Sequence, residues 1–243
     1  MLYSIVIPVY NEQENLPTLL TEVTAVMQKV NEPYEVILID DGSTDGSFHI
    51  MTSSASMDPH IHPFRLSQNS GQSAALAAGF QLAKGKYVIT MDSDLQNDPA
   101  DIVKMTPFLQ TYDMVTGWRQ KRNDTWLKRV SSRFANTVRN TLSRENINDT
   151  GCSLKIMDRH YLSKIKMFKG MHRFLPTLMK MEGASVIEIP VNHRARVAGD
   201  SKYGTWDRAF SGLRDLLVVR WMQDRFIKIC LKDRIEDKEN EHK

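Results

Sequence analysis

Residues 3–12 read Tyr-Ser-Ile-Val-Ile-Pro-Val-Tyr-Asn-Glu, an apolar run rich in β-branched residues that ends in polar ones. This pattern indicates a buried strand with polar side chains after its carboxyl end. Two similar runs, residues 35–39 and 87–91, end in Asp40-Asp41 and Asp92-Ser93-Asp94, and helix-period segments separate the three runs. The alternation predicts an α/β fold in which a mostly parallel central sheet carries helices on both faces.

Further elements extend this pattern along the chain. We predict strands at residues 61–66, 114–116 and 185–191, and helices at residues 14–29, 73–83, 126–143 and 206–231, with another starting at Pro99. Ser43 or Thr44 is expected to cap the helix that follows the second strand. The pattern predicts one large domain over residues 1–205, an amphipathic helix over 206–231 and a charged tail over 232–243.

The composition is that of an ordinary globular protein, with 41% hydrophobic and 25% charged residues in a chain of 243. A net charge of +3 is too small to indicate nucleic-acid binding. Cys152 and Cys230 lack metal-ligand spacing and are too few for a disulfide scaffold, so we interpret both as structural residues in a reducing cytosol. The sequence has no basic leader, and no apolar run reaches the roughly 20 residues that span a bilayer.

Polar residues follow the predicted strands at residues 10–12, 40–41, 92–94 and 117–119, and ligands of open parallel sheets bind at this edge. Asp92 and Asp94 flank a single residue, so their carboxylates can converge on one Mg²⁺ or Mn²⁺ ion, with Gln96 as a neutral oxygen ligand. An isolated Asp-x-Asp is more simply a turn. Its position beside other acidic strand ends favours a metal site.

The acidic turn after the second strand has two interpretations. Ser43, Thr44 and Asp45 fit a structural turn, whereas Asp41 fits a nucleotide contact, because an acidic side chain after a second strand commonly binds a ribose or a base edge. The sequence lacks both Gly-x-Gly-x-x-Gly and Gly-Lys-Ser/Thr motifs, which argues against a dinucleotide-binding fold and a P-loop enzyme.

Five segments occur in the order typical of family 2 glycosyltransferases: residues 5–12, 39–45, 69–79, 91–96 and 199–203. Over residues 3–215 the chain resembles the polyprenyl-phosphate branch, which includes dolichyl-phosphate mannose synthases and bacterial undecaprenyl-phosphate sugar transferases. The resemblance implies a GT-A fold and a divalent metal. It also implies inverting transfer of a sugar from a nucleotide diphosphate sugar to a polyprenyl phosphate, with a UDP-sugar favoured over GDP-mannose.

The resemblance also implies roles for individual residues. The residues assigned to the nucleotide sugar are Pro8, Tyr10, Glu12, Asp41, Ser93, Arg196 and Lys202, with Ser93 standing where alanine is more usual. The metal loop comprises Asp92, Asp94 and Gln96. The residues assigned to catalysis are Asp94, Arg119 and Asp149. Asp149 either orients the acceptor, acts as a base or is simply a turn residue before glycine, and these alternatives stay open.

Basic residues indicate where the acceptor phosphate binds. Arg119 and Arg133 are assigned to this phosphate because a guanidinium group suits bidentate contacts. Lys128 and Arg129 are assigned to solvent or lipid headgroups. The histidines show no paired ligand spacing, and His193 is interpreted as structural.

The last predicted helix carries an apolar stripe of Phe210, Leu213, Leu217 and Trp221, with several arginines nearby. It fits either an interfacial helix on anionic lipid or a core-packing helix with a basic outer face. By analogy with soluble relatives, we expect peripheral attachment to the cytoplasmic face of a membrane. A small membrane-spanning partner protein is expected to replace the transmembrane helices that many bacterial relatives carry.

Two other functions remain as alternatives. A family 2 transferase that acts on a saccharide or another non-lipid acceptor would have the same donor site. A catalytically inactive nucleotide-binding module would retain the fold, but the presence of Asp92, Asp94, Arg196 and Lys202 weighs against it.

Overall fold

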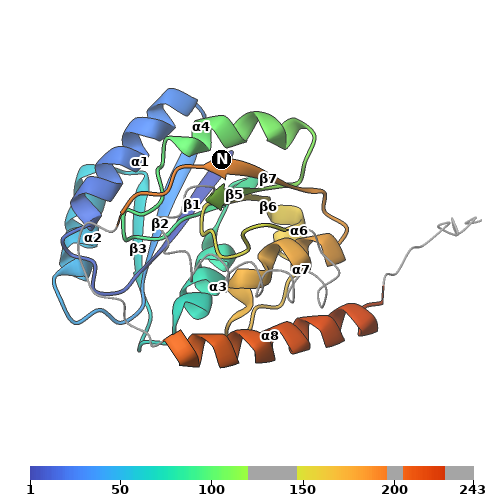
Figure 1. Ribbon diagram of the computed structural model, residues 1–243. Helices are drawn as coiled ribbons and strands as arrows, with labels where there is room; N and C mark the ends of the chain where they lie inside the picture. Colours follow the sequence, from blue (N-terminus) through green and yellow to red (C-terminus); the bar gives the residue numbers. More distant parts are fainter. Residues whose placement is uncertain (120–146, 196–204, 228–243) are drawn as a thin grey trace, which may run out of the picture.

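The computed structural model describes residues 1–119, 147–195 and 205–227, and a seven-stranded sheet of order β3-β2-β1-β4-β6-β5-β7 runs through them (Figure 1). The strands are β1 (Tyr3–Val9), β2 (Tyr34–Asp40), β3 (Ile61–Arg65), β4 (Tyr87–Thr90), β5 (Met114–Arg119), β6 (Lys155–Asp158) and β7 (Val186–Val191). The predicted mostly parallel sheet is confirmed, because β1 pairs in parallel with β2 and β4, β2 with β3, and β5 with β7.

Among the described strands, β6 is the one that the sequence pattern does not predict. It runs antiparallel to both of its neighbours, β4 and β5. Its four residues, Lys-Ile-Met-Asp, do not form an apolar run like those of the predicted strands, and this strand is defined by its tertiary pairing. Because β6 is antiparallel to both neighbours, β4 and β5 run parallel to each other. Their carboxyl ends therefore lie at the same edge of the sheet.

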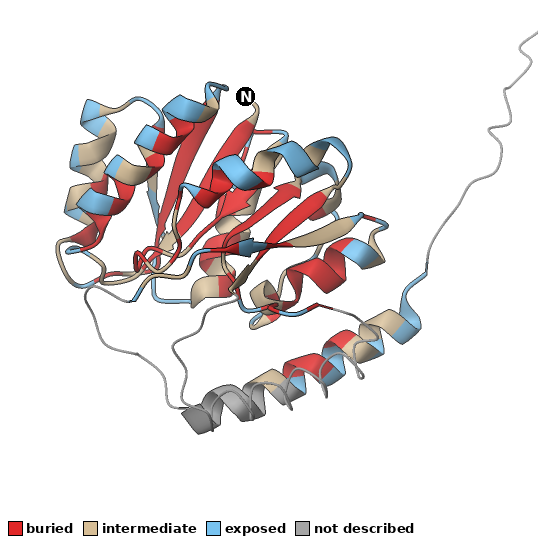
Figure 2. Cartoon of the chain, turned by 45° about the horizontal axis from the view of Figure 1, so that its top comes forward, coloured by how far each residue is buried: buried red, intermediate tan, exposed pale blue. Residues whose placement is uncertain are grey.

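Helices cover both faces of the sheet, as predicted (Figures 1 and 2). One apolar cluster contains side chains of α1 (Leu16–Val30), α2 (Ser47–Met57) and α4 (Asp101–Met105). The other contains side chains of α3 (Gln72–Leu82), α6 (Arg159–Leu162) and α7 (Leu175–Met181). Two short 3₁₀ turns, η1 (Thr106–Gln110) and η2 (Met171–Phe174), follow α4 and precede α7.

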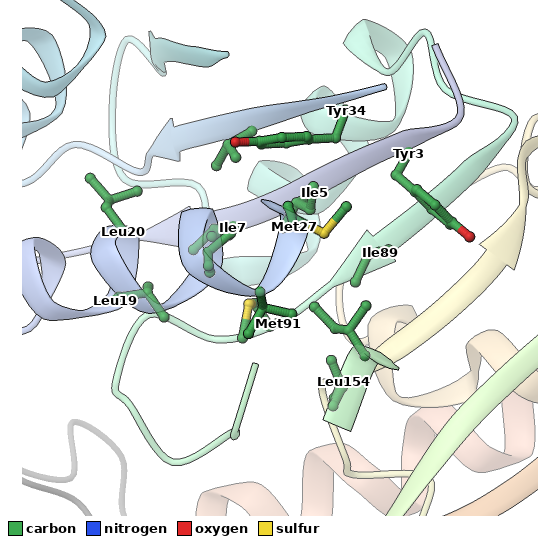
Figure 3. Close-up of a cluster of buried hydrophobic side chains, with 14 of the residues drawn as sticks. Tyr3, Ile5, Ile7, Leu19, Leu20, Met27, Tyr34, Ile89, Met91 and Leu154 are labelled. Atoms are coloured by element: carbon green, nitrogen blue, oxygen red, sulfur yellow. The ribbon is translucent and has the colours of Figure 1, made fainter. Parts of the chain in front are cut away.

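Strand β1 shows why the sheet has two apolar faces. Ile5 and Ile7 pack with α1, where Figure 3 places them beside Leu19 and Met27, whereas Val6 enters the cluster on the opposite face. Successive strand side chains point to opposite faces, so an uninterrupted apolar run is buried on both sides. Burial of each such side chain contributes about 1.5–3 kcal/mol.

The predicted cap of the second helix is wrong. Helix α2 starts at Ser47, with Gly46 at its cap position and no side-chain cap. The Ser43 hydroxyl instead accepts a hydrogen bond from the Asn11 backbone N–H at 2.9 Å. Ser43 therefore joins the turn after β2 to the turn after β1.

Helix α8 (Thr205–Arg225) lies along one end of the domain and ends earlier than the predicted residue 231 (Figure 1). Leu216 and Val219 pack in a third apolar cluster with side chains of η2 and α7. Leu217 and Trp221 of the predicted stripe are 53% and 64% exposed. The other stripe members, Phe210 and Leu213, have side chains outside the described part of the structure.

One side of α8 packs on the domain, and Leu217 and Trp221 on the helix are exposed; Figure 2 shows buried and exposed residues alternating along it. Whether the helix binds lipid stays a prediction. None of the helices in the described ranges is long and apolar enough to cross a membrane.

Candidate active site

The carboxyl ends of β1, β2, β4 and β5 meet at one edge of the sheet. Val9 pairs with Asp40 in the register of β1 and β2, so these two strands end level with each other. The charges of Arg119, the last residue of β5, and Asp92, after β4, are close enough to affect each other's pKa. The predicted convergence of polar strand ends on one site is therefore seen in the structure.

The turns after β1 and β2 are joined by hydrogen bonds between backbone and side chains. The Asn11 side-chain oxygen accepts from the Thr44 N–H at 2.8 Å, and the Ser47 hydroxyl accepts from the Glu12 N–H at 2.9 Å. The Glu12 carboxylate accepts from the Asn15 amide at 2.6 Å. These contacts hold the loop that carries Tyr10 and Glu12 in place at the edge of the sheet.

Asp41 is buried and connects β2 with the segment that leads into α3. Its Oδ1 accepts from the Ser70 N–H at 2.7 Å, and its Oδ2 accepts from the Gly71 N–H at 2.8 Å. Gly42 has φ +74°, and a Cβ there would lie 2.8 Å from the Asn69 backbone nitrogen, so glycine is required at this approach. Asp41 thus has a structural contact that the sequence did not indicate, and its assignment to the nucleotide stays a prediction.

The loop after β4 holds Asp92, Ser93 and Asp94 in a fixed turn. The Asp94 Oδ1 accepts from the Gln96 N–H at 3.2 Å, and the Asn97 Oδ1 accepts from the Asp92 N–H at 3.3 Å. Leu95 has φ +61°, an unusual conformation for a side chain of its size. Ser93 and Asp94 are buried, whereas Asp92 keeps partial access to solvent.

The electrostatics of Asp92 fit a cation ligand. Surrounding protein raises its pKa through desolvation, and the charge of Asp94 raises it further, although Ser153, Lys155 and Arg119 act in the opposite direction. A bound divalent cation would relieve the repulsion between the two carboxylates. Mg²⁺ typically takes one or two protein carboxylates and completes its shell with substrate phosphates and water. The pair is sufficient for such a site, and the described residues contain no cluster of three or more acidic, histidine or cysteine ligands.

Arg119 and Asp149 form a bidentate ion pair. The Arg119 Nε donates to Asp149 Oδ2 at 2.6 Å, and its Nη2 donates to Oδ1 at 2.8 Å. Both side chains are largely shielded from solvent. Burial alone would lower the Arg119 pKa, but the hydrogen bonds and charge of Asp149 raise it. Asp149 therefore occupies the Nε and Nη2 donors of Arg119, and Asp149 is itself held in place by a cation.

Lys155 is a buried member of the site that sequence reasoning missed. Its Nζ donates to the Cys152 carbonyl, and burial lowers its pKa. Its charge acts on Asp92 and Asp149, so it offsets part of the acidic charge of these two carboxylates. The sequence carried no signal for it because β6, on which it lies, was not predicted. Cys152 itself is a buried free thiol whose pKa is raised by burial, in agreement with its structural interpretation.

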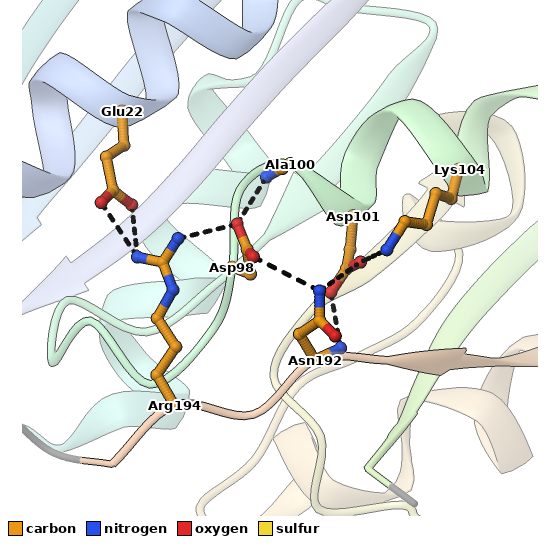
Figure 4. Close-up of polar contacts among 7 residues, drawn as sticks. All are labelled: Glu22, Asp98, Ala100, Asp101, Lys104, Asn192 and Arg194. Atoms are coloured by element: carbon orange, nitrogen blue, oxygen red, sulfur yellow. Dashed lines mark hydrogen bonds and ion pairs between the residues drawn. The ribbon is translucent and has the colours of Figure 1, made fainter.

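The chain after β7 runs back to the loop that carries Asp92 and Asp94. Arg194 donates its backbone N–H to the Gln96 carbonyl at 2.9 Å, and His193 pairs with Asn97 in an isolated antiparallel β-bridge. The Arg194 guanidinium binds Glu22 and Asp98, and Asn192 binds Asp101 (Figure 4). Residues 192–194 are therefore fixed beside the loop that carries Asp94.

Several assigned residues lie outside the described ranges: Lys128, Arg129, Arg133, Arg196, Lys202 and Cys230. Their roles stay predictions.

The site can be compared with known proteins at this point. The model of glycosyl transferase family 2 matches residues 4–166. An undecaprenyl-phosphate 4-deoxy-4-formamido-L-arabinose transferase from Aeromonas hydrophila is 40% identical over 205 residues, which are 84% of this chain and 63% of that protein. The transferase of the same name from Sodalis glossinidius is 39% identical over 202 residues, 82% of this chain and 62% of that protein. The chain thus spans just under two thirds of these relatives' length.

Solved structures support the fold. Glucosyl-3-phosphoglycerate synthase from Mycobacterium tuberculosis, in complex with Mn²⁺, UDP and phosphoglyceric acid, superposes with a TM-score of 0.68 at 16% sequence identity, covering 93% of this chain and 80% of that one. A complex of the same enzyme with Mg²⁺ and UDP gives a TM-score of 0.67 at 15% identity, with the same coverage. From the family model over residues 4–166, the two relatives and these superpositions, the chain belongs to glycosyltransferase family 2 and has the GT-A fold.

Proposed function

We propose that this protein transfers a sugar, with inversion, from a nucleotide diphosphate sugar to a polyprenyl phosphate, with Mg²⁺ or Mn²⁺ bound at Asp92 and Asp94. The observation that carries the proposal is the convergence of Asp92, Asp94 and the Arg119–Asp149 pair at one edge of the sheet. The names of the two bacterial relatives support a polyprenyl-phosphate acceptor. The Mn²⁺ and UDP bound by the structural neighbour support a divalent metal and a UDP-sugar in preference to GDP-mannose.

The leaving group sets the first chemical requirement. Displacement at the anomeric carbon expels a nucleoside diphosphate, and the cation supplies positive charge for that group. Arg196 and Lys202 are proposed to add their charges from the segment that follows Arg194. The attachment of Arg194 to Gln96 supports this, because the segment begins beside the metal loop.

The acceptor sets the second requirement. A phosphate monoester has a second pKa near 6 and is therefore largely dianionic at neutral pH. It needs little help from a general base. The ion pair of Asp149 with Arg119 favours a positioning role for Asp149, in which the carboxylate orients the guanidinium toward the acceptor phosphate. Arg133 is proposed to contact the same phosphate.

Helix α8 supplies a route to a membrane substrate. Its exposed Leu217 and Trp221 can insert into the interface, and Arg214 and Arg225 are exposed on the same helix. A peripheral position on the cytoplasmic face and a small membrane-spanning partner are parts of this proposal.

Transfer into lipid tests the function directly. The protein is incubated with Mn²⁺, a panel of radiolabelled nucleotide sugars and undecaprenyl or dolichyl phosphate, and label is counted in the organic phase. We expect a UDP-sugar to label the lipid, and EDTA to abolish the labelling. Label that moves only to a soluble saccharide would favour the alternative acceptor, and no metal-dependent turnover would favour a binding module.

The Arg133→Ala variant tests the acceptor assignment in the same assay. We expect the KM for the lipid phosphate to rise about tenfold or more, because a bidentate contact is lost, with nucleotide binding nearly unchanged. An equal loss of both would remove Arg133 from the acceptor site.

A further inference from the structure

Asp92 receives a hydrogen bond from a residue outside its own loop. The Gln72 Nε2 donates to Asp92 Oδ1 at 2.7 Å. Gln72 is the first residue of α3, and the sequence had given it no role. The Ser153 hydroxyl donates to Asn97 Oδ1 at 2.6 Å, beside the same loop, and lowers the pKa of Asp92.

Gln72 lies in a segment that is held from both sides. Upstream, the Ser70 and Gly71 N–H groups bind the two oxygens of Asp41. Downstream, the Ser73 hydroxyl accepts from the Gly170 N–H at 3.0 Å and lies 2.7 Å from His172 Nδ1. Because the backbone on both sides of Gln72 is held by hydrogen bonds, the Gln72 side-chain amide can hold its partner in one orientation.

The chemistry of an amide suits this position. An N–H donor stabilises an ionised carboxylate without adding charge, whereas a lysine here would repel a cation and a glutamate would repel Asp92. The amide occupies one lone pair of Oδ1, and further lone pairs of the carboxylate remain for a metal ion.

We propose that Gln72 is a positioning residue that orients Asp92 for the divalent cation, and that residues 70–73 thereby fix the metal carboxylate and Asp41 relative to each other. The inference rests on the proposed function, because cation binding at Asp92 is part of it. Groups that orient metal ligands in this way typically change metal affinity by about 10–100-fold when they are removed.

Binding of Mn²⁺ tests this role without relying on turnover. Free Mn²⁺ is measured by electron paramagnetic resonance during titration of the full chain with MnCl₂ in the presence of UDP. For Gln72→Met, which keeps the length of the side chain and removes the donor, we expect the Kd for Mn²⁺ to rise about 10–100-fold. Gln81→Met places the same substitution at an exposed position of the same helix and should leave the Kd unchanged.

A second variant guards against misfolding. Gln72→Asn keeps the amide but shortens its reach by one methylene, so it should also weaken Mn²⁺ binding. The thermal unfolding of all variants is compared in EDTA, where a positioning role predicts melting temperatures close to that of the unsubstituted protein.

The outcomes distinguish a failure of the proposed metal-dependent function from a failure of the positioning role of Gln72. If the unsubstituted protein binds no Mn²⁺ with UDP, the metal-dependent function itself is wrong. If it binds Mn²⁺ and the Gln72 variants bind equally well, the function stands and the positioning role is overturned. Equal weakening in Gln81→Met would also overturn it, since the effect would then come from α3 as a whole.

Discussion

Two regions of the molecule are held by different kinds of contact: the edge of the sheet where β1, β2, β4 and β5 end, and helix α8. At this edge, the Asn11 N–H donates to Ser43 and joins the turns after β1 and β2, while Gln72 at the start of α3 donates to Asp92 after β4. Helix α8 packs through a small apolar cluster that includes Leu216 and Val219. Directional bonds fix side chains in one geometry, whereas apolar packing tolerates adjustment. The difference suits the proposed functions, a rigid site for the nucleotide sugar and a helix that adapts to a surface.

The largest expected effect is on the rate of sugar transfer, from a substitution in the loop after β4. Asp94→Asn should lower sugar transfer by about 10³-fold, because it removes a charged ligand of the metal that stabilises the leaving group. The fold should survive, since the substitution is nearly isosteric. Initial rates of organic-phase labelling check this. Asp58→Asn, at the opposite edge of the sheet, is the matched control and should keep full activity, while full activity in Asp94→Asn would refute the metal assignment.

The second effect tests whether Asp149 is a base or a partner of Arg119. Asp149→Asn should destabilise the protein by about 3 kcal/mol, because it leaves the shielded Arg119 guanidinium without its counter-charge. Urea unfolding measures this loss. The double variant Asp149→Asn with Arg119→Met should recover part of it, since no buried charge is then left unpaired. A large loss of turnover with unchanged stability would instead identify Asp149 as a base.

The sequence predicted the parts of this site that are local. Buried parallel strands with polar ends are visible as apolar runs that stop at acidic residues, which located Asp41, Asp92 and Asp94 correctly at one edge. Arg119 and Asp149 were both identified, but their ion pair was not, because it joins residues 30 apart in the sequence.

Other features could not be predicted because their cause is tertiary. Lys155 lies on a four-residue strand that is defined by its pairing with β4 and β5. Gln72 gains its role from the approach of α3 to the metal loop. Ser43 was expected to cap a helix, but its hydroxyl accepts a hydrogen bond from the Asn11 N–H in the turn after β1. In each case a contact between distant segments decides what a locally ambiguous residue does.

His172, in η2, makes the stability of the protein depend on pH. Burial, followed by the charges of Arg173 and Lys155, lowers its pKa from 6.5 to about 3. Between these values the unfolded chain binds a proton that the folded chain does not, so stability falls as the pH decreases from about 6.5 toward 3 and is unaffected above this window.

At about 1.4 kcal/mol per pH unit, the loss between pH 7 and pH 5 is about 2 kcal/mol. Urea unfolding of the unsubstituted protein and of His172→Gln at both pH values measures it. The substitution should remove most of the difference, whereas His60→Gln, at an exposed histidine, should not. A pH dependence that His172→Gln retains would assign the effect to other groups.

The smallest expected effect is on membrane binding, from single substitutions in α8. Helix α8 should hold the protein on anionic vesicles through exposed apolar side chains, with about 1 kcal/mol added by each basic residue near the surface. Arg214→Gln should therefore weaken binding about fivefold, and Trp221→Ala should weaken it without changing its salt dependence. High salt should release much of the protein, because ions screen the electrostatic part within about 10 Å at 0.1 M. Vesicle flotation at low and high ionic strength measures these effects.

The control for this last experiment is a chain truncated after Thr205, which should stay in the soluble fraction under both conditions. A membrane-spanning partner would hold the protein through contacts that salt screens less, so retention of the intact chain on partner-containing vesicles at high salt would identify its contribution. If the intact chain stays soluble on purely anionic vesicles at low salt, direct attachment through α8 is wrong. Attachment would then depend on the partner, because the exposed face of Leu217 and Trp221 would have to bind protein instead of lipid.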